Sequence, residues 1–365
     1  MKTLSKVLLS LFVLLPGIFA FSQPTSPDSL LLSHFRPQSV FQTPITKIEK
    51  PRYPVIDMHA HVYAKTPEQV SEWVKCMDEA GLRKSIILTM AHGAEFDSIY
   101  ALYAPYPDRF EVWCGFDYTG FDQPGFGPAA VAELERCVKV GAKGVGELGD
   151  KGLGLFYCDP AAEGMHSSDP RMDPLFEKCA ELNLPINIHI AEPIWMYLPM
   201  DSTNDGLMNA FKWRIEKSPD KLDHAGMMEV LRQTLARHPN TTFIACHLAN
   251  CAYDLKILGE MFDKYPRFYA DISARFAENS QTPRATRAFF EKYKDRILYG
   301  TDMGTFDPAF YRATFRILES QDEHFYMPQY SSYHWPFNGL YLDDQTLEQI
   351  YRANASKIML IRDGK

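Results

Sequence analysis

Two histidines one residue apart are the first side chains in this sequence that could do chemistry together. His59 and His61 end an apolar run that begins at Val55. Successive side chains of a β-strand alternate between its two faces, so both histidines would point the same way. Two imidazoles on one face, at the end of a buried strand, form half of a metal site. The rest of the chain should then supply further ligands.

Four more candidate ligands follow, each at the end of a β-rich run. They are Glu147, His189, His247 and Asp302. A mixture of imidazole and carboxylate binds divalent metals such as zinc and manganese. Each of these residues alone would more often be an ordinary polar residue, and Glu147 could instead pair with Lys143. Their coincidence at equivalent strand ends predicts a divalent metal centre.

Eight short β-rich runs, separated by segments with helical spacing, must position these residues. The expected strands span residues 55–61, 85–91, 110–117, 142–148, 185–191, 242–247, 268–273 and 297–301. Helical patterns include residues 67–81, 129–140, 173–183 and 227–238. Eight strands alternating with helices over about 250 residues predict the α/β class and a (β/α)8 TIM barrel. A doubly wound open sheet is the competing arrangement.

The same residues resemble those of a known enzyme superfamily. The Asp-Met-His-Ala-His run at 57–61, together with His189, His247 and the Tyr-Gly-Thr-Asp motif at 299–302, resembles the amidohydrolase superfamily. The order and spacing are similar to its amidohydrolase-related branch of metal-dependent hydrolases and nonoxidative decarboxylases. Residues 350–358 are similar to the closing helix of that branch. The resemblance covers about residues 53–361 and does not identify the substrate.

The resemblance implies a role for each matched residue. His59, His61 and His189 would bind the metal, and Asp302 would bind the metal or its water and act as general base. His247 would either bind a second metal or polarise the substrate carbonyl. Glu147 falls where some members have a glutamate that bridges two metals, so one or two ions remain open. Zinc is the first expectation, with manganese as the alternative.

Two long connections, residues 149–173 and 192–226, follow expected strand ends. Long loops in compact domains are often lids or binding loops. Trp195 lies in the second connection and is a candidate for substrate binding, although aromatic residues more often pack. His92 and Arg275 follow the second and seventh strands. Both could bind an anionic substrate, or serve ordinary surface roles.

The first residues have the pattern of a secretory signal peptide. Lys2 and Lys6 precede an apolar run at 8–19, and residues 20–22 are Ala-Phe-Ser. We expect residues 1–22 to be removed, so the protein would be periplasmic or secreted, without stable membrane insertion. An uncleaved membrane anchor is the alternative. Residues 23–52 would form an extended lead-in, and residues 53–365 would form the barrel.

The charge of the chain also limits its partners. The formal net charge is −8 and becomes −10 without residues 1–22, which carry two lysines and no acid. Nucleic-acid binding would normally require a basic patch, so it is not expected. Seven cysteines without a CxxC pair do not form a disulfide framework. The expected partner is a small-molecule substrate, and assembly into a homo-oligomer is open.

Three functions are compatible with these residues. The first is a metal-dependent hydrolase that activates water to cleave an amide, ester or lactone, with Asp302 and His247 as catalytic residues. The second is a metal-dependent nonoxidative decarboxylase or hydratase of an unsaturated or aromatic carboxylic acid. The third is a non-catalytic binding protein on the same barrel, against which the complete ligand set argues. The hydrolase is the preferred hypothesis.

Overall fold

The computed structural model describes residues 26–304 and 306–364. The chain divides into two units, and the first ends at Phe35 while the second begins at Arg36. The described part of the first unit contains one short 3-10 helix, η1 (Leu32–His34). Residues 36–54, in the second unit, carry no helix or strand. The expected signal peptide, residues 1–22, lies outside the described residues and stays a prediction.

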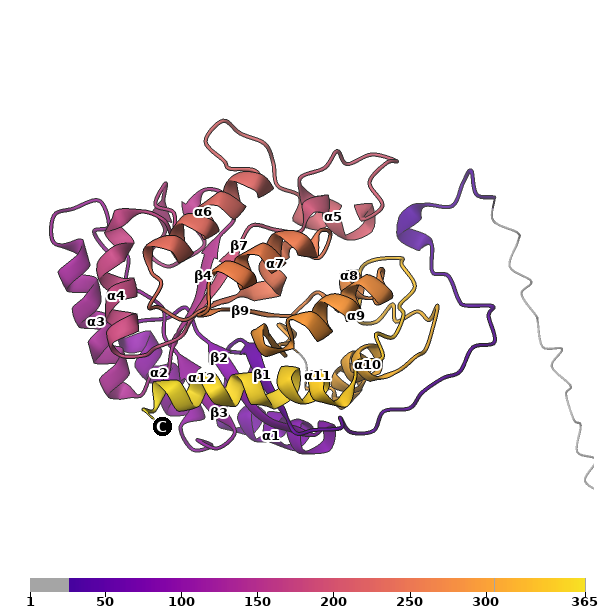
Figure 1. The fold of residues 1–365 in the computed structure, drawn as a ribbon, viewed down its shortest axis with the longest axis horizontal. Coiled ribbons are helices and arrows are strands. Elements are labelled where there is room, and N and C mark those ends of the chain that lie inside the picture. Colours follow the sequence, from indigo (N-terminus) through magenta and orange to yellow (C-terminus); the bar gives the residue numbers. More distant parts are fainter. Residues whose placement is uncertain (1–25, 305, 365) are drawn as a thin grey trace, which may run out of the picture. The chain divides into compact units, whose positions relative to one another are not determined.

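Eight parallel strands form the centre of the second unit (Figure 1). They are β1 (Val55–Ala60), β2 (Leu82–Leu88), β3 (Phe110–Trp113), β4 (Val145–Asp150), β7 (Ile186–Ile190), β8 (Phe243–Ala245), β9 (Phe268–Asp271) and β10 (Ile297–Leu298). All eight expected strands are present, with shifted ends. The strand order is β1-β2-β3 in one sheet and β10-β9-β8-β7-β4 in the other.

Backbone hydrogen bonds join the edges of these two sheets. At one edge, the Met58 N–H donates to the Tyr299 carbonyl over 2.9 Å, which links β1 to the chain after β10. At the other, the Cys114 N–H donates to the Gly144 carbonyl over 3.1 Å, and the Gly146 N–H donates to the Cys114 carbonyl over 2.9 Å. The eight strands therefore follow one another around a common centre, as in a (β/α)8 barrel. The doubly wound alternative is wrong.

Helices lie around the outside of the strands (Figure 1). The α-helices are α1 (Pro67–Ala80), α2 (Gly93–Tyr103), α3 (Phe126–Val140), α4 (Asp173–Glu181), α5 (Leu207–Trp213), α6 (His224–Arg237), α7 (Leu255–Lys264), α8 (Phe276–Asn279), α9 (Pro283–Lys292), α10 (Pro308–Glu319), α11 (Asp344–Glu348) and α12 (Asn354–Arg362). The short helical turns are η2 (Pro170–Met172), η3 (Ile194–Met196), η4 (Cys246–Asn250), η5 (Lys294–Arg296) and the π-helical η6 (Gln349–Ala353). A two-stranded hairpin, β5 (Gly154–Leu155) with β6 (Ala162–Glu163), follows β4.

Helix α1 shows how local sequence sets these boundaries. The Thr66 hydroxyl accepts a hydrogen bond from the Gln69 N–H, and Pro67 takes the first helical position. Gly81 ends the helix at φ 88°, a left-handed conformation that glycine adopts without a Cβ clash. A Cβ at Gly81 would also lie 2.7 Å from the Pro51 ring. The expected helix over 67–81 therefore forms, with Gly81 as its cap.

The strands are buried on both faces, which explains their continuous apolar runs. Every residue of β1 is buried, including Asp57 and His59. The main core lies between the strands and the surrounding helices, and α12 adds Ala355 and Ile358 against strand residues such as Ile56. Polar side chains within such strands need partners, so His59 and Asp57 mark the part of the fold where chemistry is placed.

Three of the six expected ligands, His61, His247 and Asp302, lie after regular strand pairing has ended, and the other three lie within strands. The expected strands 55–61, 242–247 and 297–301 stop earlier, at Ala60, Ala245 and Leu298. The expected strand 142–148 instead begins at Val145 and continues to Asp150. A strand that stops early does so because the chain must leave the hydrogen-bonded strand pairing before it can turn the following side chains toward the barrel centre.

None of the helices in the described residues is both long and apolar enough to cross a bilayer. All seven cysteines are free thiols, and six of them are buried.

The two long connections carry short elements of their own, the β5–β6 hairpin with η2 in the first and η3 with α5 in the second.

Candidate metal centre

The six expected ligands converge at the carboxyl ends of the strands. His59 lies in β1 and His61 follows it, Glu147 lies in β4, His189 lies in β7, His247 follows β8 and Asp302 follows β10. The backbone hydrogen bond from the Asp302 N–H to the His59 carbonyl, 2.8 Å long, places these two residues side by side. Tertiary structure therefore brings together side chains separated by up to 243 positions of sequence.

A first group of ligands surrounds the two histidines of β1. The His61 Nε2 atom lies 3.3 Å from an Asp302 oxygen and 3.4 Å from Glu147 Oε2. The His59 Nε2 atom lies 3.7 Å from the same Asp302 oxygen and 3.9 Å from Glu147 Oε2. Potential ligand atoms of His59, His61 and Asp302 all lie within 4.8 Å of one another, close enough to hold one ion.

A second group lies on the other side of Glu147. The Oε1 atom of Glu147 is 2.6 Å from His189 Nδ1 and 3.8 Å from His247 Nε2. Ligand atoms of Glu147, His189 and His247 also lie within 4.8 Å of one another. Each carboxylate oxygen of Glu147 thus faces a different group, which is the arrangement that a bridging ligand needs.

Outer hydrogen bonds orient three of the four histidines in the same way. Nδ1 of His59 lies 3.0 Å from Asp271 Oδ2. Nδ1 of His61 lies 2.9 Å from the Leu88 carbonyl, and Nδ1 of His247 lies 2.9 Å from the Ser273 carbonyl. A carbonyl only accepts, so Nδ1 of His61 and His247 carries the proton. This leaves Nε2 bare for a metal, the usual pattern of histidine ligands.

The residues present fit a divalent metal. His59 Nε2 is fully buried and has no hydrogen-bond partner among the described residues. An unpaired buried polar atom is costly, and here it faces the carboxylates of Glu147 and Asp302. An ion at this point would satisfy the nitrogen and neutralise both carboxylates. His59, His61 and Asp302, with Glu147, would hold it.

The charged side chains among these candidate ligands and their neighbours strongly shift one another's pKa values. Burial alone would lower the pKa of His59, but the carboxylates of Asp271, Asp302 and Glu147 raise it to about 9. Burial alone would raise the pKa of Glu147, but the neighbouring His189 holds it well below its usual range. Such opposed shifts are typical of functional sites.

One important residue, Asp271, was assigned no role from the sequence. Its carboxylate accepts from Nδ1 of His59, from the His247 N–H over 3.0 Å and from the Asn187 amide over 3.2 Å. It also accepts from the Ser273 hydroxyl over 2.5 Å. An aspartate within the apolar run 268–272 was the available signal, since a buried carboxylate requires partners.

Replacing Asp271 with asparagine should weaken metal binding about 10- to 100-fold, the usual effect of losing the partner that orients a histidine ligand. The affinity would be measured by competition with a chromogenic chelator. Asp322→Asn is the matched control, because Asp322 is equally buried but pairs with Arg316 and Thr46. An unchanged affinity in Asp271→Asn would contradict this role.

Several non-glycine residues shortly after strand ends adopt positive φ angles, between 51° and 63°. Among them are Met90, Ala191, His247, Ala274 and Asp302. This left-handed conformation costs about 1 kcal/mol or more for residues with a Cβ and is concentrated at functional sites. Here it turns the chain sharply at the rim of the barrel, which presents His247 and Asp302 to the centre.

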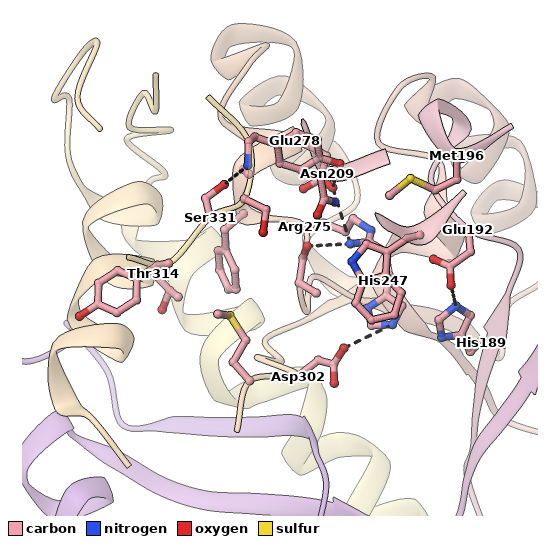
Figure 2. A pocket seen from close by; sticks show the side chains of 18 of the residues that line it. His189, Glu192, Met196, Asn209, His247, Arg275, Glu278, Asp302, Thr314 and Ser331 are labelled. Atoms are coloured by element: carbon pink, nitrogen blue, oxygen red, sulfur yellow. Dashed lines mark hydrogen bonds and ion pairs between the residues drawn. The ribbon is translucent and has the colours of Figure 1, made fainter. Parts of the chain in front are cut away.

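A cavity of about 470 Å³ opens over the centre (Figure 2). Four of the candidate ligands, Glu147, His189, His247 and Asp302, line this cavity. Arg275 also lines it, whereas His92 and Trp195 do not. His92 precedes α2, with Nε2 3.8 Å from Asp117, and Trp195 packs against Trp335 with ring centroids 5.4 Å apart. Of the three expected substrate-binding residues, only Arg275 reaches this cavity.

Solved structures with similar folds support the barrel architecture. One is 2,6-dihydroxybenzoate decarboxylase from Rhizobium, with 17% identity, a TM-score of 0.53, and coverage of 85% of this chain and 99% of that chain. Another is an uncharacterized TIM-barrel protein from Bordetella bronchiseptica, with 16% identity, a TM-score of 0.53, and coverage of 86% and 100%. The TIM barrel expected from the sequence is thus confirmed.

No curated protein matches this sequence. A family model described as amidohydrolase, however, matches residues 56–359, which run from β1 into α12 and include all six candidate ligands. That family is enzymatic and typically metal-dependent. The chain belongs to the amidohydrolase family.

Proposed function

We propose that this protein is a metal-dependent hydrolase that cleaves a neutral amide, ester or lactone with two divalent ions. The observation that carries the proposal is the position of Glu147, whose two oxygens face two separate groups of ligands. His59, His61 and Asp302 would hold one ion, and His189 and His247 the other. Zinc suits this mixture of imidazole and carboxylate best, and manganese is the alternative.

Divalent ions held here would act as Lewis acids and lower the pKa of a bound water toward neutrality. Asp302 lines the cavity beside them and would accept the proton of the attacking water. Burial alone would raise the pKa of Asp302, but His59 and His61 hold it below its usual value. The carboxylate is therefore ionised at neutral pH and able to take a proton, then deliver it to the leaving group.

For His247, the structure favours ligation over a contact with the substrate carbonyl. Because Nδ1 donates to the Ser273 carbonyl, Nε2 carries no proton in the neutral ring. Burial and the nearby Arg275 guanidinium hold the pKa of His247 well below its usual value, so the ring is neutral at pH 7. A bare nitrogen binds a metal but donates no hydrogen bond to an oxyanion. His247 would therefore serve as a ligand.

The cations on the cavity wall are already paired, which favours a neutral substrate. Arg275 donates to Asn250 Oδ1 over 2.9 and 2.7 Å and to the Ala274 carbonyl over 2.7 Å, and it lies 3.6 Å from Glu278. Lys151 forms an ion pair with Glu192. Neither cation is left free for a carboxylate, so the expected anion-binding role of Arg275 is not favoured, and neither is decarboxylation.

Metal stoichiometry would test the proposal first. Elemental mass spectrometry of protein purified without chelators should find about two zinc ions per chain. Glu147→Ala should hold one ion or none, because the bridging oxygens are lost. Glu163→Ala is the matched control, since Glu163 is an exposed glutamate in β6, away from the cavity. Wild type should also hydrolyse members of a panel of esters, lactones and amides.

Two results together would overturn the proposal. The first is a single ion that is unaffected by Glu147→Ala. The second is release of carbon dioxide from a panel of aromatic and unsaturated carboxylic acids, without hydrolysis of any ester, lactone or amide. That pair of results would support the decarboxylase alternative on the same barrel.

A further inference from the structure

The two long connections, after β4 and β7, expose large apolar side chains to solvent. They are Phe156, Tyr157, Leu198, Phe211 and Trp213. Of these five, Tyr157 and Trp213 also line the cavity over the metal centre. Those two rings are therefore the ones that a molecule bound in the cavity would contact.

Both rings lie at the opening of the cavity. Trp213 is 51% exposed and Tyr157 is 47% exposed, although each of them lines the cavity. A side chain that lines a cavity and is also half exposed to solvent must stand where the cavity meets the solvent. Tyr157 follows β5 and Trp213 ends α5, so each long connection contributes one aromatic ring to this opening.

Helix α5 presents one of its faces to the cavity. Asn209 and Trp213 are four residues apart, so they lie on the same face of the helix, and both line the cavity. Phe211, two residues from each, does not line it. In Figure 2, Asn209 lies across the cavity from Asp302. The face of α5 that carries Trp213 thus forms the wall opposite Asp302.

The rest of the lining is largely apolar. It contains four methionines and several aromatic rings, among them Met196, Met303, Met327 and Phe276. Methionine adapts its shape to apolar and aromatic groups. The apolar surface therefore continues from the interior of the cavity onto two exposed rings at its opening. A continuous apolar surface of this kind is typical of a groove that binds an apolar ligand.

A lysine lies near each of the two rings but leaves surface for a ligand. Lys151 Nζ is 5.0 Å from the centroid of the Tyr157 ring, and Lys212 Nζ is 5.3 Å from that of Trp213. A cation placed over an aromatic ring covers one of its two faces. Because each ring remains about half exposed, the lysines do not account for its whole surface.

We propose that Trp213 and Tyr157 are specificity-determining residues that bind an apolar group of the substrate, which extends from the scissile carbonyl to the opening of the cavity. This inference rests on the proposed function for the placement of the carbonyl at the metal centre. The substrate class is therefore a neutral ester, lactone or amide that carries an apolar tail.

The test uses three γ-lactones that differ only in the length of their tail. They carry a methyl, a butyl or an octyl group on the γ-carbon. Binding of each to the metal-loaded protein would be measured by calorimetry, and hydrolysis would be followed separately. The affinity of wild type should rise with tail length, by roughly fourfold for each methylene group that becomes buried.

Trp213→Ala should weaken binding of the octyl lactone about tenfold or more, since several methylene groups lose their contact with the indole ring. The loss should be smaller for the butyl lactone and smallest for the methyl lactone. Tyr157→Ala, on the other connection, should show the same dependence on tail length, and it serves as the test if Trp213→Ala does not fold.

Phe211→Ala is the matched control. Phe211 is an exposed aromatic residue of the same helix, 58% exposed, but it does not line the cavity. This variant should keep the wild-type affinity for all three lactones. Metal content, thermal unfolding and molecular mass in solution would be measured for every variant.

Five outcomes would overturn this inference. They are equal affinity of wild type for the three lactones, no binding of any of them, and a loss in Trp213→Ala that does not depend on tail length. The other two are an equal loss in Phe211→Ala and a change of oligomeric state in Trp213→Ala, which would make the ring a contact between copies of the chain. Failure of the proposed function gives a different result, because the dependence on tail length would be present and sensitive to Trp213, but none of the lactones would be hydrolysed.

Discussion

Replacing His59 with alanine is expected to remove bound metal and activity together. His59 Nε2 faces Glu147 and Asp302, and its Nδ1 is held by Asp271. Without the imidazole, the first group of ligands loses its most buried member. Because a metal supplies several kcal/mol of transition-state stabilisation, kcat/KM should fall about 1,000-fold or more. Elemental mass spectrometry and ester hydrolysis would be measured on the same preparation.

The matched control is His34→Ala, because His34 is exposed and lies outside the barrel. It should retain wild-type metal content and rate. Circular dichroism would show whether His59→Ala keeps its secondary structure. A folded His59→Ala variant with full metal content and normal activity would contradict the assignment of this residue. Normal activity without metal would contradict the whole proposed mechanism.

Replacing Asp302 with asparagine should separate catalysis from metal binding. Asparagine keeps the size of the side chain and one oxygen for ligation, but it does not accept a proton at neutral pH. Loss of a general base typically lowers kcat by about 100- to 10,000-fold. Metal content should fall much less than in His59→Ala, because His59, His61 and Glu147 remain. The measurements are kcat, KM and ions bound per chain.

Asp117→Asn is a closely matched control for this substitution. The Asp117 side chain is 27% exposed and that of Asp302 is 28% exposed, but Asp117 does not line the cavity. The control should keep the wild-type kcat. If Asp302→Asn also kept the wild-type kcat, another group would have to accept the proton. If it lost all metal, the role of Asp302 would be ligation alone.

Periodicity and residue type were sufficient to predict most of the architecture. Strands buried on both faces must be apolar throughout, so runs such as β1 and β7 stand out from the amphipathic helices between them. In helix α1, the N-cap Thr66, the first-position Pro67 and the terminal Gly81 all lie in the helix or directly beside its ends. These are local effects, which depend only on neighbouring residues and therefore can be read from one sequence.

The exact ends of the strands could not be predicted, because they depend on how all eight strands pair around the barrel. The chain leaves the ladder after Ala245, and His247 adopts a left-handed conformation there. Leu248 and Ala249 are not residue types that favour positive φ, and the modest enrichment of histidine there does not by itself place His247 in this conformation. That conformation is imposed by partners far away in sequence, including Asp271, which accepts from the His247 N–H.

The sequence by itself determined which residues could form a metal centre, because imidazoles and carboxylates coincide at equivalent ends of several expected strands. It also determined the α/β barrel, because the apolar periods of strands and helices differ. Only the tertiary structure decided which oxygen of Glu147 faces which histidines and that Asp271 orients His59. Only the tertiary structure also decided that Arg275 is already paired with Glu278 and Asn250. These are contacts between residues distant in the chain, and their geometry exists only once the barrel has closed.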